Sequence, residues 1–462
     1  MTMIPENEIQ ILERAMAMAL EAGAQKARFT LSWSCMDSFA TLNGELDRVN
    51  HCLDHALTIC LFVDGRFGSF STNLLQLETL GPFLQKAVST VRMLAEDPCR
   101  DLPDPARTAR DARTGRELGL LDPAYASINA ARRLDLAGKA AIFPEMGNKE
   151  LRSETGMTYR LISEEGEYSD TLTDQLVIDS NGLRCRHTET AFEYGVETTI
   201  QDSEGRKYSG YWWDSSPLLE RLDLRFLGRT AMERAAAQIA PENPASGKYN
   251  LVVDSECASR LVNPLLKALG GYSLQQRNSF LEGTLGTQVF SEGLTLVDRP
   301  RTPGRSGSKL FDSEGVATKE APIIEGGIVR TYFINTYIAR KMNTTATVEE
   351  ALRPVLLPYL SPVLGERPSA LDRKAILEKV KNGILVTGFN GGNNNSSTGD
   401  FSYGIEGFLF EEGRITRPVR EMLITGNFLT LWNHLLAAGD DARFCMSKLI
   451  PTLAFENVDF SS

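Results

Sequence analysis

Histidine and closely spaced cysteines are scarce in this sequence. Its 462 residues include four histidines, which are His51, His55, His187 and His434. The seven cysteines are odd in number and widely spaced, and no CxxC pair occurs. Disulfide-rich domains and structural zinc sites depend on clustered cysteines and histidines, so neither is expected to organise this fold. We expect the cysteines to be buried free thiols.

An excess of positive charge is also missing. Lys and Arg number 49 against 60 Asp and Glu, which gives a formal net charge of −11. The basic residues are scattered among acidic ones, and such a chain repels a polyphosphate backbone unless it carries a strong basic patch. No phosphate-binding loop, dinucleotide-binding loop or nucleophile elbow occurs either. The sequence therefore argues against nucleic acid as the main partner.

Long apolar runs are absent as well. The longest candidate, Ala56 to Val63, has the length of a strand, whereas a membrane-spanning helix needs about 20 residues. The N-terminus, MTMIPENEIQILERAM, is acidic and amphipathic, and it lacks the basic start and apolar stretch of a signal peptide. We expect a cytoplasmic protein that does not enter a membrane.

The patterns that are present predict an α+β protein. Glu6 to Ala22 carries apolar residues at helical spacing. Arg28 to Thr72 alternates apolar and polar residues, with tight-turn dipeptides at Asn43-Gly44 and Asp64-Gly65. That alternation predicts an antiparallel meander.

The next part of the chain predicts a mixture of helices, strands and a linker. Helices are expected from a cap at Thr79 to about Ala95, at Ala126 to Phe143 and at Leu218 to Ile239. Strands are expected from Arg152 to Tyr211, between turn dipeptides. Glu96 to Pro123 is rich in Pro, Asp and Arg, so it should form a linker packed on the surface.

The best domain boundary is the segment PENPASG, from Pro241 to Gly247. It divides the chain into residues 1–240, a mixed antiparallel N-terminal α/β domain with a helical linker and hairpins, and residues 241–462, a β-rich C-terminal domain. The second domain is expected to be largely antiparallel and to contain helices at Glu256 to Leu269 and Phe428 to Ala438.

Few residues suggest catalytic chemistry. His51 and His55 stand four apart in HCLDH, a spacing that could bind a metal on a helix. The segment leads into an alternating strand, where residues four apart lie about 13 Å from each other, so surface or turn histidines are the simpler interpretation. No pair of carboxylates stands out, and we interpret four glutamates as solvated: Glu320, Glu325, Glu349 and Glu350.

The loop GFNGGNNNSSTGDFSYG, from Gly388 to Gly404, is too polar for a core and too long for a minimal turn. Its backbone amides and Asn side chains could line a groove that binds an extended peptide, and a solvated loop is the alternative. The candidates for the groove wall are Asn395, Thr398, Gly399 and Asp400. For Thr398 and Asp400 the alternative is a turn held by side-chain hydrogen bonds.

The segment from Thr398 to Asn427, TGDFSYGIEGFLFEEGRITRPVREMLITGN, resembles the TldD/PmbA peptidase family. The family pattern there is roughly TGD-x-S-x-G-x-x-GF-x-x-E-x-G-x-I-x-x-PV-x-E-x-x-I-x-GN. Three more stretches agree with the family: Ser279 to Leu296, Phe311 to Thr318 and Ile323 to Lys341. The resemblance covers the C-terminal half well and the N-terminal half more weakly. There GRFGSFST, Gly65 to Thr72, and the order of strands and turns fit.

The resemblance implies one of two member types. TldD-type members carry an HExxxH helix, and a cysteine near the C-terminus completes their zinc site, whereas PmbA-type (TldE) members lack these histidines and pair with a TldD-type subunit. In this chain the positions of His, Glu and His hold Val262, Asn263 and Lys267, and Cys445 occupies the third-ligand position. These degenerate positions should not hold zinc tightly. We therefore expect no metal or cofactor in this chain, and zinc in a TldD-type partner.

Two further features depart from the family pattern, and the second bears on the shape of the cleft and the contact with a partner. Pro264 stands inside the aligned helix and removes a backbone donor. The segment from Asn343 to Leu371 contains four prolines where the family has a Gly-rich stretch.

The resemblance thus implies a PmbA/TldE-like non-catalytic subunit of a cytoplasmic metallopeptidase complex. Its role would be to bind extended or unfolded peptides and to close the proteolytic chamber. The family processes leader peptides of modified peptide antibiotics (microcins), and older family labels mention modulation of DNA gyrase. One alternative is a stand-alone homodimeric peptide-binding or scaffold protein without protease activity. Another is an enzyme with a relocated site that uses His187, His434 or a cysteine.

Overall fold

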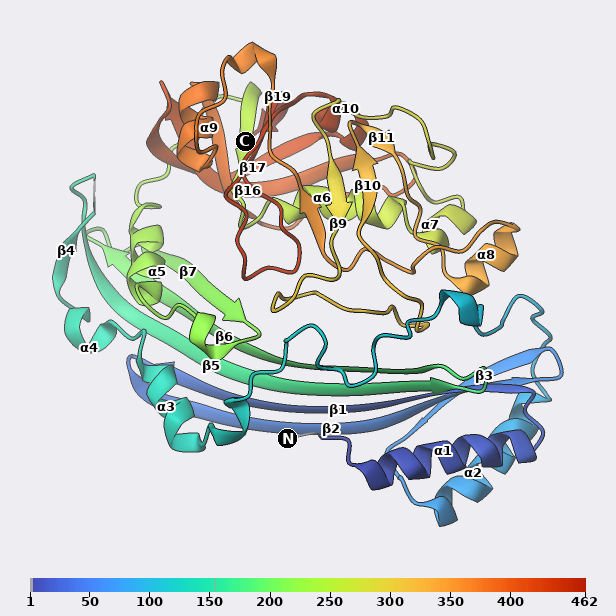
Figure 1. The fold of residues 1–462 in the computed structure, drawn as a ribbon. Coiled ribbons are helices and arrows are strands. Elements are labelled where there is room, and N and C mark those ends of the chain that lie inside the picture. The colour runs from blue at the N-terminus through green and yellow to red at the C-terminus, as the bar shows by residue number, and fades with distance from the viewer. Residues whose placement is uncertain (1–2, 154) are drawn as a thin grey trace.

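The computed structural model describes residues 3–153 and 155–462 of the chain. Figure 1 shows two layers, with a long curved sheet from the N-terminal half below and a β-rich unit from the C-terminal half above. Helices from the N-terminal half lie beneath the long sheet at both of its ends. The α+β class expected from the sequence is confirmed.

The lower sheet is antiparallel and has unusually long strands. Its strands are β1 (Lys26–Leu42), β2 (Glu45–Val63), β3 (Arg66–Thr72), β4 (Glu150–Arg152), β5 (Thr158–Asp179), β6 (Arg184–Asp202) and β7 (Lys207–Ser216). Their order is β3-β2-β1-β5-β6-β7, with β4 beside β5. The turns at Asn43-Gly44 and Asp64-Gly65 are confirmed, since all four residues have positive φ, as two-residue hairpins require.

The described residues of this half form the α-helices α1 (Glu6–Glu21), α2 (Leu77–Val91), α3 (Ala130–Gly138), α4 (Phe143–Met146) and α5 (Leu227–Ala236). Helices α1 and α2 bury their apolar stripes against Phe29 and Leu31 of β1 and their neighbours on β2. Farther along the same face, α3 and α5 pack on Phe192 and Tyr194 of β6. Each large side chain buried in this way contributes about 1.5–3 kcal/mol to folding.

The segment from Glu96 to Pro123 corrects the expectation of a surface linker. It runs over the other face of the sheet, between the two layers (Figure 1). Ala112, Leu118 and Leu120 are buried there against Cys185 of β6 and Phe311 of the upper unit. The composition of the segment suggested a linker packed on the surface, but its few apolar residues are buried between the two layers.

Five strands of the upper unit close into a barrel. They are β8 (Gly247–Val253), β14 (Gly383–Phe389), β16 (Asp400–Glu411), β17 (Arg414–Asn427) and β19 (Leu453–Ser461). The closure comes from β8, which pairs with β14 on one side and with β19 on the other. The β8–β14 pair is parallel and the other pairs are antiparallel. Three short strands extend this sheet: β13 (Tyr359–Leu360), β15 (Asn393–Asn394) and β18 (Leu435–Ala438).

A second small sheet and five helices complete the upper unit. The sheet has the order β11-β10-β9-β12, with β9 (Leu296–Asp298), β10 (Ala321–Glu325), β11 (Ile328–Val329) and β12 (Pro354–Leu356). The helices are α6 (Ser259–Ala268), α7 (Gly271–Gln275), α8 (Thr336–Met342), α9 (Arg373–Val380) and α10 (Phe428–Asn433). The proline-rich segment from Asn343 to Leu371 supplies β12 and β13, so it contributes strands to both sheets.

Several helix boundaries expected from the sequence are wrong. Helix α2 begins at Leu77 after Gln76, and the Thr79 hydroxyl donates to the Gln76 carbonyl instead of capping the helix. The segments at Ala126 to Phe143, Leu218 to Ile239 and Glu256 to Leu269 contain shorter helices, α3, α5 and α6. The helix expected over Phe428 to Ala438 ends at Asn433, and the apolar residues that follow form β18. Short apolar runs fit a helix and a buried strand equally well.

The expectation that the cysteines are buried holds for Cys185 alone among the seven. Cys52 is exposed and the other five are half-buried, and all seven are free. The structure has no helix, within residues 3–153 and 155–462, that is long and apolar enough to cross a membrane.

Close packing of α5 on β7 depends on Gly210. A Cβ atom at this position would lie 2.1 Å from the Ala231 carbonyl oxygen and 2.5 Å from the Ala235 nitrogen. We therefore expect Gly210→Ala to push α5 away and to lower the free energy of unfolding by about 1–3 kcal/mol. Thermal unfolding checks this expectation. The control is Ser209→Ala on the same strand, where the side chain is exposed and the change should stay within about 0.5 kcal/mol. Equal midpoints for the two variants would contradict the packing argument.

Candidate functional site

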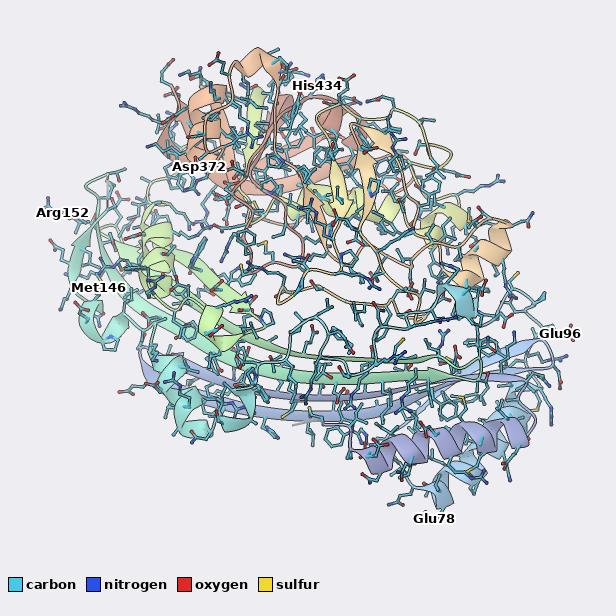
Figure 2. All side chains as sticks on the ribbon, viewed as in Figure 1. Glu78, Glu96, Met146, Arg152, Asp372 and His434 are labelled. Atoms are coloured by element: carbon cyan, nitrogen blue, oxygen red, sulfur yellow. The ribbon has the colours of Figure 1, made fainter. Side chains whose placement is uncertain are left out.

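A cleft of about 990 Å³ lies between the lower sheet and the upper unit. Strand β7 and helix α5 form one wall, and β16, β17 and the turn after β8 form the other. Figure 2 labels Met146 and Arg152, which line the cleft, at the outer end of the lower sheet. Arginine outnumbers glutamate in the lining, where the charged residues are Arg152, Arg229, Arg234, Arg373, Arg417, Arg420, Glu197, Glu233, Glu256 and Glu406.

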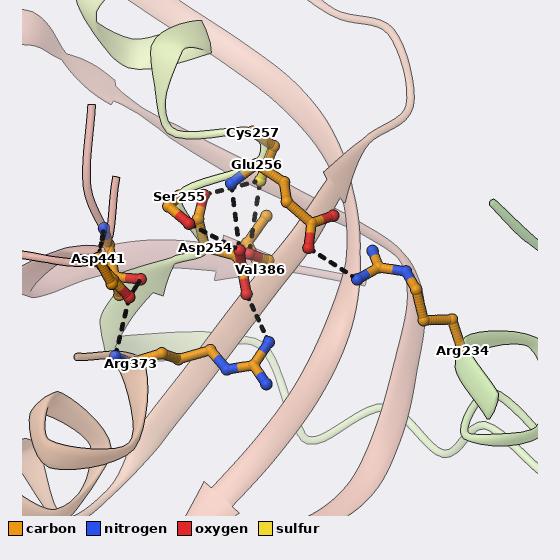
Figure 3. Close-up of polar contacts among 9 residues, drawn as sticks. Arg234, Asp254, Ser255, Glu256, Cys257, Arg373, Val386 and Asp441 are labelled. Carbon is orange, nitrogen blue, oxygen red and sulfur yellow. Dashed lines mark hydrogen bonds and ion pairs between the residues drawn. The ribbon is translucent and has the colours of Figure 1, made fainter. Parts of the chain in front are cut away.

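A buried carboxylate stands where β8 ends at the cleft. Asp254 is 3% exposed, and its backbone N–H donates to the Val386 carbonyl of β14 at 2.9 Å. One carboxylate oxygen accepts from the Glu256 backbone N–H at 3.1 Å, and the other accepts from the Arg373 guanidinium at 2.6 Å (Figure 3). A buried carboxylate without such a partner would be strongly destabilising, so Arg373 holds this turn in place.

A second carboxylate, Glu256, joins the two halves of the chain. Its Oε1 accepts from Nη1 of Arg234, on α5, at 2.9 Å (Figure 3). Burial and then repulsion from Asp254 raise the pKa of the Glu256 carboxyl to about 7, against the lowering effect of nearby arginines. Glu256 therefore changes its charge near neutral pH, at the point where the cleft walls meet.

Cys257 follows in the same turn. Its thiol donates to the carbonyl oxygens of Asp254 and Val386, each at 3.6 Å. Burial, then the negative charges of Asp254 and Glu256, raise the pKa of this thiol well above its usual value. Since the thiolate is the reactive form of cysteine, Cys257 completes the turn and is not placed to act as a nucleophile.

Arginines stack on the two tryptophans of β7. The Arg443 guanidinium lies 4.2 Å from the ring centroid of Trp212 and 4.9 Å from that of Trp213. Arg234 lies 5.1 Å from the Trp212 ring, from the α5 side, and Arg443 also donates to the Trp213 carbonyl. These cation–π contacts fix both guanidinium groups beside the cleft.

The cleft combines an edge strand with exposed apolar side chains and arginines. β7 is an edge strand of its sheet, and edge strands can pair with an added peptide strand. Tyr211 and Ile415 line the cleft with 49% and 48% of their surface exposed, so apolar side chains can pack there. The arginines favour acidic groups on the ligand. Among the described residues, no histidine lines the cleft.

Helix α6 carries the positions that the family resemblance aligns with metal ligands. Val262 is fully buried, whereas Asn263 and Lys267 are exposed. Nζ of Lys448 donates to Oδ1 of Asn263 at 2.5 Å. A valine side chain has no donor atom, and two ammonium groups would repel a cation. These residues therefore do not fit a zinc ion at α6.

Cys445, the candidate for the third-ligand position, lies in the loop between β18 and β19. Its carbonyl oxygen accepts from the Ser215 hydroxyl of β7 at 2.9 Å, so this loop contacts the lower sheet. Burial raises the pKa of the Cys445 thiol. The half-buried thiol thus lies in a contact between the two layers.

The four groove candidates of the polar loop lie together but outside the lining of the large cleft. Asn395 Oδ1 accepts from the backbone N–H of Ser397 at 2.9 Å. The Thr398 hydroxyl donates to Asp400 at 2.6 Å, and Asn427 donates to the other Asp400 oxygen at 2.8 Å. Gly399 has φ of 81° and donates its N–H to the Asn395 carbonyl. The side chains satisfy one another, which is the arrangement of the alternative turn interpretation.

Sequence reasoning missed Asp254, Glu256 and their arginine partners. The signal was the sequence VVDSE, in which two carboxylates follow directly on a buried strand. Arg234 and Arg373 come from segments 22 and 119 residues away from their partners. No local pattern shows that pairing.

Two family profiles match most of the chain. A profile described as the PmbA/TldA metallopeptidase central domain matches residues 127–239, and a profile described as the PmbA/TldA metallopeptidase C-terminal domain matches residues 246–462.

Similar proteins extend the match to the full length. The chain is 26% identical to metalloprotease PmbA of Escherichia coli O157:H7 over 459 residues, which cover 97% of this chain and 96% of the relative. A solved structure from Bacteroides thetaiotaomicron, named as a candidate modulator of DNA gyrase, is 38% identical, with a TM-score of 0.91 and all of both chains covered. TldE from Thermococcus kodakarensis shares the fold, with a TM-score of 0.79 and 18% identity over 98% of this chain and 100% of that chain.

The raised pKa of Glu256 makes stability depend on pH. A carboxyl whose pKa is higher in the folded state favours folding when it is protonated, and this contribution is lost as the pH rises through about 7. The Glu256→Gln variant has no carboxyl group at this position, so it does not lose stability for this reason as the pH rises. The melting temperature of the variant minus that of the wild type should therefore grow from about pH 5 to pH 7 and then level off.

Thermal unfolding in a pH series checks this course. Glu366→Gln, in an exposed loop outside the cleft lining, removes the same charge outside that turn and serves as the control. A difference between Glu256→Gln and wild type that stays constant or shrinks over this range would contradict the assignment.

Proposed function

The chain belongs to the PmbA/TldD metallopeptidase family, and from this premise we propose that it acts as a PmbA/TldE-like subunit without a metal site at α6. Its role is to bind peptides in the cleft between its two layers and to close the chamber of a complex. The zinc belongs to a TldD-type partner, where it would activate the water that hydrolyses the peptide bond. Peptides and unfolded segments are the proposed substrates.

The observation that carries the proposal is the composition of α6. Asn263 and Lys267 are exposed, and the Lys448 ammonium group donates a hydrogen bond to the Asn263 side chain. A metallopeptidase site needs three protein ligands and an open position for water. Here an amide and two ammonium groups occupy the corresponding surface, which supports a binding role for this chain.

The residues that line the cleft support a role in binding extended, acidic peptides. The carbonyls of Ser209 and Trp213 on β7 already accept hydrogen bonds from Gln238 and Arg443. An extended peptide can pair with the β7 edge at Tyr211, between them, and place apolar side chains on Tyr211 and Ile415. Arg373 and Arg234 are already engaged by Asp254 and Glu256, so these two carboxylates limit the positive charge that a ligand meets. The remaining arginines of the lining then favour peptides with acidic side chains.

Co-purification tests whether this chain is a subunit. The tagged chain is purified from its own cell lysate, and the proteins that accompany it are identified and quantified. We expect a family member with an HExxxH motif in equal amount. A chain that emerges alone as a homodimer would contradict the subunit proposal and favour the stand-alone peptide-binding protein.

Peptide binding tests the cleft independently of any partner. Tyr211→Ala and Ile415→Ala remove half-exposed side chains of the cleft wall, and circular dichroism confirms that both variants fold. Each should weaken the binding of an unfolded acidic peptide by about 5- to 30-fold, the effect of losing about 1–2 kcal/mol at a contact residue. Fluorescence anisotropy of a labelled peptide measures this affinity.

Met93→Ala is the matched control, because Met93 is 80% exposed and lies just past α2, outside the cleft lining. Equal affinity of Tyr211→Ala, Ile415→Ala and Met93→Ala would show that the peptide binds elsewhere.

A further inference from the structure

We propose that Cys35 and Asp37 of β1 and His51 of β2 form a binding site for a thiophilic divalent metal ion such as Zn²⁺. The site lies on the N-terminal sheet and is separate from α6 and from the peptide-binding cleft. Its ligands come from two paired strands, so the fold itself brings them together.

The register of the sheet places the three side chains on one face. Asp37 stands directly opposite His51 in the antiparallel β1–β2 pair. Cys35 precedes Asp37 by two residues, so its side chain points to the same face of the strand. One ligand atom from each residue, the Cys35 sulfur, an Asp37 oxygen and a His51 nitrogen, lies within 4.8 Å of the other two. Among the described residues this is the one group of three such side chains that meets this distance.

The donor set suits zinc. Zn²⁺ binds thiolate sulfur at about 2.3 Å, imidazole nitrogen and carboxylate oxygen at about 2.0–2.2 Å. The His51 Nδ1 atom is already 2.9 Å from Oδ1 of Asp37. The His51 side chain is 60% exposed, so its ring can turn toward an ion without disturbing the core. Three protein ligands leave a fourth position open to water.

Arg133 contacts the Asp37 carboxylate through the oxygen that does not face His51. Arg133 of α3 lies 3.1 Å from Oδ2 of Asp37 and donates two hydrogen bonds to the buried Asp170, at 2.7 and 2.9 Å. Oδ1, the oxygen that faces His51, is the one available to a metal ion. Partners that hold the outer oxygen of a ligating carboxylate orient it for binding. The positive charge of Arg133 weakens the attraction of this site for a cation. The negative charge of Asp170, to which Arg133 is hydrogen-bonded, offsets part of that effect.

The surroundings leave the site accessible. On the helix-covered face of the sheet, α1 contacts Trp33 and His55 through Glu8, whereas α3 reaches Asp37 through Arg133. The Tyr125 hydroxyl lies 3.5 Å from the Cys35 carbonyl oxygen, so this end of the site is partly covered, and the site opens to solvent on the side of His51, whose side chain is 60% exposed. The thiol of Cys35 is half-buried, which raises its pKa, so a bound metal would replace the thiol proton. His55, four residues from His51, pairs with Glu8 and takes no part.

Titration of the full-length, metal-free chain with Co²⁺ tests the proposal. Cobalt bound to a thiolate gives a charge-transfer absorption band that does not depend on any enzyme activity. We expect one equivalent of Co²⁺ to produce the band in the wild type, and Zn²⁺ to displace it. Cys35→Ser should abolish this band, and His51→Gln should weaken Co²⁺ binding by about 10-fold or more. Circular dichroism confirms that both variants fold.

Cys52→Ser is the matched control. Cys52 is exposed and stands next to His51 on β2, opposite Met36, so its side chain points to the other face of the sheet. This variant should keep the band and the affinity of the wild type. The proposal is overturned if the wild type gives no band, if Cys52→Ser loses it, or if His51→Gln binds Co²⁺ as tightly as the wild type. None of these outcomes bears on the co-purification or peptide-binding tests.

Discussion

The structure depends on covering both faces of one very long antiparallel sheet. Strand β5 has 22 residues and β2 has 19, so at about 3.3 Å per residue the sheet spans more than 60 Å. Helices cover the ends of one face, and the buried linker and the upper unit cover the other. Different elements therefore cover different parts of each face along the length of the sheet. The cleft lies along the β7 edge of the sheet. Cys35, Asp37 and His51 lie on the strands β1 and β2, where α1 contacts Trp33 and α3 contacts Asp37.

The charged residues at the cleft follow from the same constraint. The turn after β8 places Asp254 in the interior of the barrel wall, where it needs the Arg373 partner. Glu256, two residues later, reaches back to Arg234 on α5. The contact between the two layers is thus partly ionic at this end. At the linker it combines buried apolar residues with ion pairs, since Asp111 pairs with Arg301 and Asp101 pairs with Arg340. Ionic contacts respond to pH and salt, and the pKa of about 7 for Glu256 makes the cleft end the part whose charge changes near neutral pH.

The sequence predicted the parts of the fold that depend on local patterns. The hairpin turns at Asn43-Gly44 and Asp64-Gly65 follow from the need for positive φ, which these residues tolerate. The closure of the barrel could not be predicted, because Lys248 of β8 pairs with Asp459 of β19 from the far end of the chain. The burial of the linker was missed for a related reason, since its apolar residues are too few to show a period.

For the candidate site too, the sequence predicted only features that depend on a local pattern. The degenerate residues of α6 could be identified by their resemblance to a metal-binding motif, whereas the pairing of Glu256 with Arg234 required the packing of α5 against the upper unit. The groove candidates were chosen for the polar side chains and backbone amides of their loop, and the structure shows that Thr398 and Asp400 also hold a turn through their side chains. Polar residues in a loop therefore do not distinguish a binding surface from a turn until their partners are known.

The most direct test of the central claim is the rate at which an unfolded peptide is hydrolysed by this chain, by its co-purified HExxxH-bearing partner, and by the two together. The account predicts no hydrolysis by this chain alone and efficient, zinc-dependent hydrolysis by the pair. Hydrolysis by this chain alone, at a rate that the partner does not change, would contradict it.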